Sequence, residues 1–416
     1  METLFLSPVL ILTIAGILGL FMAWGIGAND VANAMGTSVG SKALTLKQAI
    51  IIAAIFEFLG AYLAGGEVTS TIRKGIVDPQ IYTTDLNIFI IGMMSSLLAA
   101  GSWLYIASNK GWPVSTTHSI VGAIVGFVVI TKGIDAVSWS KVGEIASSWI
   151  TSPLIAAILA FFIYLSAQKL IINAKNQVAA AIFYIPFYSF FVTGIIAQVI
   201  ARKGLSHIGL SWSDDEILVF TTLMALLAGG LTSLVLRLKK ESISSKGGIE
   251  YAFGILMIVT ACAMAFAHGS NDVANAIGPV AAIISVVNSN DLSSTAPINP
   301  AVLLLGGAGI VFGLATLGYK VIKTVGEKIT KLTPSLGFSA EMAAASTVVF
   351  ASYLGFPIST THTLIGGVIG VGLANGAKNL DWSSVYRIFA SWIITIPVGA
   401  VLTILFYVLL RVMFGV

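Results

Sequence analysis

A ten-residue stretch decides how this chain folds: Gly27-Ala28-Asn29-Asp30-Val31-Ala32-Asn33-Ala34-Met35-Gly36. It recurs 242 residues later as Gly269-Ser270-Asn271-Asp272-Val273-Ala274-Asn275-Ala276-Ile277-Gly278. A second stretch, Gly111-Trp112-Pro113-Val114-Ser115-Thr116-Thr117-His118, recurs 244 residues later as Gly355-Phe356-Pro357-Ile358-Ser359-Thr360-Thr361-His362. We name these the Asn-Asp boxes and the Ser-Thr-Thr boxes. Because the two offsets are nearly equal, they indicate a duplication that covers most of the chain.

The composition places these boxes in a membrane. Hydrophobic residues make up 57% of the 416 residues and charged residues only 10%, whereas soluble proteins carry about 25% charged residues. So few charges could not cover a soluble surface, and we therefore predict a polytopic membrane protein. The single cysteine, Cys262, excludes an intrachain disulfide, and no basic run is long enough to indicate a nucleic-acid partner.

Apolar runs bounded by charges or by Gly, Pro and Asn predict the membrane spans. A helix satisfies its own backbone hydrogen bonds in lipid, so each span is expected to be helical. The fold class that we predict is an all-α membrane protein with about 12 transmembrane segments. The predicted spans are 8–35, 45–65, 87–108, 113–131, 145–168, 179–201, 214–236, 249–285, 300–320, 338–354, 357–374 and 386–410.

The boxes divide the chain into an N-terminal repeat (1–168), two linking spans with a cytoplasmic loop (169–248) and a C-terminal repeat (249–416). The first Asn-Asp box lies on the first span and its copy on the eighth, seven spans later. An odd number of spans reverses the direction in which the chain crosses the membrane, so the two repeats are expected to be inverted. Two inverted five-span repeats, with interrupted or half helices at a central site, are the plan of secondary transporters. The distribution of Lys and Arg predicts a multi-pass protein of the cell membrane with both termini outside.

Each Asn-Asp box places a carboxylate and two amides on a membrane helix. Asp30 and Asn33 are one helical turn apart and share a face, and an Asp at the centre of such a helix costs about 2.5–3.5 kcal/mol. Carboxylate and amide oxygens suit Na⁺ or a bound proton, and the flanking glycines allow the helix to break and expose carbonyls. Hydrogen bonding between helices is the alternative role. The predicted cation ligands are Asn29, Asp30, Asn33, Asn271, Asp272 and Asn275.

Each Ser-Thr-Thr box has the features of a helix start. Proline and hydroxyl residues begin helices, because the hydroxyls accept hydrogen bonds from free N–H groups. A helix N-terminus inside the membrane offers unpaired N–H donors and a partial positive charge, which suits an anion. Two such termini with clustered hydroxyls fit an oxyanion, phosphate best and sulfate or arsenate almost as well, although the hydroxyls could also serve only as caps. The predicted phosphate contacts are Ser115, Thr116, Thr117, Ser359, Thr360 and Thr361.

Four further polar residues lie near the boxes or inside a span. His118, His362 and His268 each adjoin a box, and we favour helix–helix hydrogen bonding for them over sensing or relaying protons. Glu57 is an isolated acid within the second span, and no clear counterpart is found in the second repeat. It is a candidate for ion coupling or, equally, for a hydrogen bond between helices.

The two pairs of boxes resemble those of the inorganic phosphate transporter (PiT) family, which includes sodium–phosphate symporters. The resemblance covers both repeats, whereas the sixth and seventh spans carry no motif. It implies cotransport of phosphate with Na⁺ or H⁺, cation sites at the Asn-Asp boxes and phosphate contacts from the Ser-Thr-Thr boxes. One departure is Pro279 after the second Asn-Asp box, where the first copy has Thr37. The two cation sites therefore need not be equivalent.

The function that we predict is phosphate import by cation symport, with Na⁺ favoured as coupling ion and no cofactor. An H⁺-coupled symporter and a sulfate carrier of the same fold are the alternatives. An anion channel is the alternative of a different class, although a pure anion pore has no need of intramembrane acids. An intramembrane hydrolase does not fit a duplicated site, so an enzyme is not expected. Membrane lipid and a second copy, forming a homodimer, are the other expected partners. The lysine-rich stretches 237–246 and 320–331 are interpreted as cytoplasmic loops, with unspecific contact to anionic lipid as a second interpretation.

Overall fold

The computed structural model describes residues 4–74, 76–204, 210, 212–289, 298–322, 332–376 and 380–416. These residues form helices, and the described ranges hold only one isolated β-bridge, between Val77 and Val137. Most of the second lysine-rich stretch, 323–331, lies outside them. The longer helices are α1 (Pro8–Asn29), α2 (Val31–Gly40), α3 (Leu46–Ala64), α5 (Leu86–Asn109), α6 (Thr116–Lys132), α7 (Trp139–Ala167), α8 (Gln177–Val199), α10 (Asp214–Leu238), α12 (Gly248–Ser289), α13 (Pro300–Gly313), α15 (Pro334–Tyr353), α16 (Thr360–Ala374) and α17 (Trp382–Phe414).

Every predicted span is occupied by a helix, which confirms the all-α class of a membrane protein, whereas the inversion of the repeats stays a prediction. In the described part of the chain, nine helical stretches are long and apolar enough to cross a membrane. α6 and α16 are shorter apolar helices, and α15 covers the predicted span 338–354. One short helix was not predicted from the sequence, namely α4 (Gly66–Lys74), which packs against α12.

The two Asn-Asp boxes differ in local structure. The first box is interrupted at Asp30, which ends α1 and begins α2. Its copy lies within α12, a single helix of 42 residues that continues through Pro279. The predicted break therefore occurs in the first repeat only.

The Ser-Thr-Thr boxes lie in two helical hairpins, which we name the first hairpin (α5 and α6) and the second hairpin (α15 and α16). The turn of the first hairpin spans 110–115, and the turn of the second spans 354–359. Both α6 and α16 begin at buried residues of a box rather than at a surface. They are the half helices that the sequence predicts.

The half helix of each repeat packs against a long helix of the other repeat. α6 lies against α17 of the other half, and α16 lies against α7. Small residues permit this closeness: a Cβ on Gly122 would overlap the backbone of Ile396, and a Cβ on Gly366 would overlap the backbone of Pro153. Glycine contacts of this kind are typical of membrane helix pairs, because they let two backbones approach.

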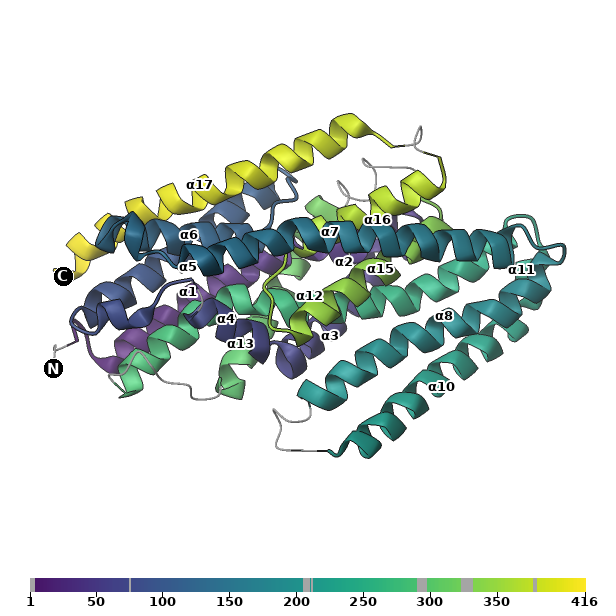
Figure 1. Cartoon of the computed structure of the whole chain (residues 1–416), viewed down its shortest axis with the longest axis horizontal. Coiled ribbons are helices and arrows are strands. Elements are labelled where there is room, and N and C mark those ends of the chain that lie inside the picture. The colour runs from purple at the N-terminus through teal and green to yellow at the C-terminus, as the bar shows by residue number, and fades with distance from the viewer. Residues whose placement is uncertain are drawn as a thin grey trace.

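The linking helices α8 and α10 form an antiparallel pair at the edge of the molecule (Figure 1). Both expose apolar side chains along their length, such as Phe183, Phe191 and Leu227. A short helix, α11 (Lys240–Ser244), follows α10 and leads into α12. The Asn-Asp and Ser-Thr-Thr boxes therefore lie in the helices and turns of the two repeats and not in this pair.

Candidate functional site

The serine of each Ser-Thr-Thr box is the N-cap of the helix that follows. Ser115 has an extended backbone, and its Oγ accepts a hydrogen bond of 3.2 Å from His118 N. Ser359 does the same for His362 N, also at 3.2 Å. An N-cap hydroxyl satisfies one of the N–H groups that a helix start leaves unpaired. The hydroxyl proton of each serine is not needed for this contact.

The first asparagine of each Asn-Asp box holds a hairpin turn. Asn29 Nδ2 donates to Ser108 Oγ at 3.1 Å and to Trp112 O at 2.9 Å. Asn271 Nδ2 makes the matching contacts in the second hairpin, to Ser352 Oγ and Phe356 O, both at 3.0 Å. Both asparagines therefore fix a Ser-Thr-Thr box against an Asn-Asp box.

The carbonyl oxygens of these two asparagines differ. Asn29 Oδ1 accepts a hydrogen bond of 3.1 Å from Val114 N, whereas Asn271 Oδ1 has no hydrogen-bond partner among the described residues. Only the second asparagine thus offers a side-chain oxygen that is free to bind a cation. The two Asn-Asp boxes therefore differ in the oxygens that they offer.

The two aspartates face each other across the repeats, with threonines between them. Asp30 accepts from Thr116 Oγ1 and from Thr361 Oγ1, each at 2.7 Å. Asp272 Oδ2 accepts from Thr360 Oγ1 at 2.9 Å and lies 3.4 Å from Thr116 Oγ1. Each carboxylate is therefore bound by a threonine of its own repeat, and Asp30 is also bound by a threonine of the other.

The second asparagines of the boxes complete the network. Asn33 Nδ2 donates to Thr361 Oγ1 at 2.8 Å and also contacts Asp30 Oδ1. Asn275 Nδ2 lies 3.2 Å from both Thr116 Oγ1 and Thr117 Oγ1. Their amide nitrogens therefore bind the threonines of the opposite repeat.

All twelve predicted ligands are brought together, and each is at most 1% exposed. Several of their buried oxygens have no hydrogen-bond donor in the described structure. These oxygens are Asn33 Oδ1, Asn271 Oδ1, Asn275 Oδ1 and Asp272 Oδ1. Buried acceptors are almost always satisfied in proteins, so these four oxygens are candidate ligands for a hard cation such as Na⁺.

The threonine hydroxyls are engaged by the carboxylates and by the chain itself. Thr116, Thr360 and Thr361 donate to aspartates, and Thr117 Oγ1 donates to Ile358 O at 2.9 Å. An anion at these hydroxyls would lie beside two carboxylates. An oxyanion at this site would therefore require cations that neutralise the aspartates and hydroxyls that turn toward the anion.

His268 and Glu57 belong to the same centre. His268 Nδ1 lies 2.6 Å from Glu57 Oε2, and its Nε2 lies 2.9 Å from Asp272 Oδ2 and 4.0 Å from Asp30 Oδ2. All four side chains are buried. The hydrogen bond between His268 and Glu57 joins α12 to α3, which is the helix–helix role that we favoured for the histidine.

The pair of His268 and Glu57 joins the two repeats, and the duplication supplies no second pair of this kind. The position 242 residues before His268 is Ile26. A Cβ on Gly269 would overlap the backbone of Glu57. A Cβ on the matching Gly27 would overlap the backbone of Ile310, so Ile310 is the counterpart of Glu57. Both isoleucines are fully buried. The sequence shows no clear counterpart of Glu57 in the second repeat, and in the structure the matching position holds the apolar side chain of Ile310.

His118 and His362 lie away from the aspartates. His118 Nδ1 is 3.2 Å from Trp392 O, and His362 Nδ1 is 3.2 Å from Trp149 O. The two rings are 4.5 Å apart. Each histidine therefore ties its half helix to the long helix of the opposite repeat.

One buried acid was missed. Glu341 on α15 accepts from Thr37 Oγ1 and Ser38 Oγ at 2.5 Å each, and from Thr260 Oγ1 at 2.7 Å. Its side chain is fully buried. The signal that identified Glu57, a lone acid within an apolar run, was present here as well.

Known proteins share these features over almost the whole chain. A family model described as the phosphate transporter family matches residues 26–403. A protein of Haemophilus influenzae, named as a candidate phosphate permease, is 48% identical over 97% of both chains. The chloroplastic inorganic phosphate transporter 2-1 of Arabidopsis thaliana is 44% identical, over 93% of this chain and 70% of its own. A solved structure titled "The sodium-dependent phosphate transporter" superposes with a TM-score of 0.90 and 39% identity, over 97% of this chain and 99% of that one.

Proposed function

Because this chain belongs to the phosphate transporter family, it is a symporter of inorganic phosphate, and we propose that Na⁺ bound at the two Asn-Asp boxes drives the import. Relatives named for phosphate transport, and a solved neighbour whose title names sodium dependence, support this proposal. The observation that carries it is the set of unpartnered buried oxygens around Asp272, Asn271, Asn33 and Asn275. Oxygen ligands of this kind suit Na⁺ better than they suit a softer metal.

The order of binding follows from charge. Two buried carboxylates repel a phosphate anion, so cations bind first and convert the centre into an anion site. Once Na⁺ attracts the carboxylate oxygens, the hydroxyls of Thr116, Thr360 and Thr361 become available to phosphate. The N-termini of α6 and α16 add partial positive charge. In this proposal the same threonines bind the aspartates when Na⁺ is absent and phosphate when Na⁺ is bound. Phosphate binding therefore depends on Na⁺.

The charge balance supports more than one coupling cation. Moving one charge through 100 mV costs about 2.3 kcal/mol, so importing a phosphate dianion against an inside-negative potential costs roughly 4.6 kcal/mol. Two Na⁺ ions cancel this cost, and a third makes import electrically favourable. The two Asn-Asp boxes supply two sites.

Proton coupling is the second candidate, and the contact between His268 and Glu57 favours it. This pair links a carboxylate on α3 to both aspartates, and such chains carry protons in other membrane proteins. Sulfate carriage is the other alternative to phosphate. The uptake experiment below separates all three.

The membrane arrangement that we propose is an inverted pair of repeats, 1–168 and 249–416, joined by 169–248. Figure 1 supports it, since α1 begins near the N-terminus whereas α12 begins beside α11 at the opposite end of the molecule. If the first hairpin enters and leaves the membrane on the same side, the chain crosses the membrane two fewer times between α1 and α12. The number of spans from α1 to α12 then stays odd, and α12 still runs opposite to α1. We further propose a cell-membrane location, both termini outside, and a homodimer.

The test is ³²P-phosphate uptake into proteoliposomes under an inward Na⁺ gradient, an equal K⁺ gradient or a proton gradient. We expect accumulation with Na⁺ only, and no competition from excess unlabelled sulfate. Accumulation that follows the proton gradient and ignores Na⁺ would replace Na⁺ by H⁺. Equal slow equilibration under all three would indicate a channel.

A further inference from the structure

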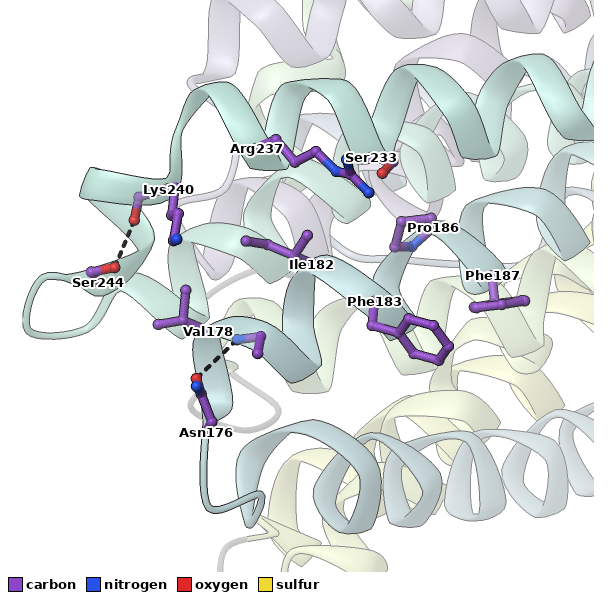
Figure 2. A pocket seen from close by; sticks show the side chains of 11 residues that line it. Asn176, Val178, Ile182, Phe183, Pro186, Phe187, Ser233, Arg237, Lys240 and Ser244 are labelled. Carbon is purple, nitrogen blue, oxygen red and sulfur yellow. Dashed lines mark hydrogen bonds between the residues drawn. The ribbon is translucent and has the colours of Figure 1, made fainter.

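A groove lies where α8 begins and α10 ends, closed on one side by α11 (Figure 2). Its volume is about 770 Å³. One wall is apolar and belongs to α8, where Phe183 is 60% exposed and Phe187 is 52% exposed. Val178, Ile182 and Pro186 extend this wall toward the start of α8.

The opposite wall carries two cations. Arg237, near the end of α10, and Lys240, at the start of α11, both line the groove. Figure 2 shows the Arg237 side chain lying along the groove toward Ser233, and Lys240 pointing down toward Val178. Neither forms an ion pair with a described residue. The lining residues include no carboxylate, although Glu241 follows Lys240 in the chain.

We propose that this groove binds an anionic phospholipid. Arg237 and Lys240 would bind the phosphate of its headgroup, and an acyl chain would lie against Phe183, Pro186 and Phe187. The groove lies at the ends of two apolar helices, where the hydrocarbon core gives way to the headgroup region. Long basic side chains reach from an apolar surface into that region, and they attract anionic lipid.

The surrounding charge favours the same occupant. The same end of the molecule carries further exposed lysines, Lys169, Lys175, Lys239 and Lys246. Such an excess marks the cytoplasmic side of a membrane protein, where the leaflet contains anionic lipid. Free phosphate would use the two cations but not the aromatic wall. An apolar wall that ends in a pair of cations matches the chemistry of a phospholipid over its whole length.

The test is native mass spectrometry of the purified transporter with equal amounts of phosphatidylglycerol and phosphatidylcholine. The wild type should retain phosphatidylglycerol in preference. The double variant Arg237→Gln, Lys240→Gln should bind it roughly 30-fold more weakly, as expected when two cations are removed from an anionic headgroup. The matched control is Lys239→Gln, Lys246→Gln, which removes the same charge from the same end but leaves the groove lining intact. It should retain the lipid.

Three outcomes would overturn the proposal. If the wild type retained phosphatidylcholine as well as phosphatidylglycerol, the headgroup charge would not contribute to binding. If both double variants lost phosphatidylglycerol equally, the lipid would be attracted by the basic surface in general and not by the groove. Displacement of the lipid by excess inorganic phosphate would make a soluble anion the occupant. Phe187→Ala should also weaken retention, which tests the apolar wall separately. Since the readout is lipid binding, it does not depend on which cation drives transport.

Discussion

Thr361 of the second repeat donates a 2.7 Å hydrogen bond to Asp30 of the first, although 331 residues separate them in the chain. Thr116 of the first repeat also lies between the two aspartates, 2.7 Å from Asp30 and 3.4 Å from Asp272. The threonines that are expected to contact phosphate therefore already contact the residues that are expected to bind cations. This shared use of hydroxyls is the physical basis of coupling in our account.

Replacing either aspartate should abolish the cation dependence of transport. Asp272→Asn and Asp30→Asn remove a charge but keep the shape and the hydrogen-bonding oxygen. We expect at least a tenfold loss of Na⁺-stimulated phosphate uptake, because the amide lacks the negative charge that attracts the cation, and two unit charges about 4 Å apart interact by about 4 kcal/mol at an effective dielectric constant of about 20. Uptake rates measured against Na⁺ concentration give the result. Retention of wild-type Na⁺ dependence in both variants would remove the carboxylates from the mechanism.

Thr361→Val should weaken Na⁺ and phosphate binding together. The variant removes the hydroxyl that donates to Asp30 but keeps the branched shape. The matched control is Thr363→Val, two residues further along α16, whose hydroxyl donates only to Ser359 O, at 2.8 Å. We expect a roughly tenfold rise in the Na⁺ concentration for half-maximal uptake in Thr361→Val only. The same rise in the control would show that the effect comes from α16 as a whole.

Ser115→Ala combined with Ser359→Ala should have two separable effects. Each loses an N-cap, which costs about 1 kcal/mol of stability, so the melting temperature should fall. Each also loses a hydroxyl proton that is available to phosphate, so the apparent KM for phosphate should rise. A lower melting temperature with an unchanged KM would mean that the serines serve only as caps.

Gly122→Ala should destabilise the contact between the two repeats. The new Cβ would overlap the Ile396 backbone, and overpacking of this kind costs about 1–3 kcal/mol. Gly143→Ala on α7 is the control, because no atom lies within 4 Å of its added Cβ. Thermal unfolding in detergent should show a lower midpoint for Gly122→Ala alone. Equal midpoints would mean that α6 and α17 are not held as closely as described.

The sequence predicted the helices and the convergence of the boxes well. Hydropathy identifies each apolar run, and a duplicated polar string in a membrane can be satisfied only by partners brought to the same place. For this reason the boxes could be assigned to one central site without any structure, although the closeness of Asp30 and Asp272 was not predicted. Glu57 was also recognised, because an isolated acid within a span stands out.

The sequence could not show which residue binds which. The pairing of Thr361 with Asp30, and of His362 with Trp149 O, depends on α16 packing against α7 of the other repeat. Which helices pack together depends on close backbone contacts at glycines. The sequence contains no periodic pattern that identifies the partner of each glycine. The unbroken course of α12 through Pro279 is likewise a result of packing, since the local sequence favours an interruption.

The most direct test of the central claim is the reciprocal flux. If Na⁺ and phosphate share one centre, each must drive the other, because coupling between two bound ligands is mutual. We would measure ²²Na⁺ uptake into proteoliposomes under an inward phosphate gradient, with an equal sulfate gradient as control. The account predicts that phosphate drives Na⁺ accumulation, that sulfate does not, and that Asp272→Asn abolishes the effect. Na⁺ uptake that is the same with and without a phosphate gradient would contradict it.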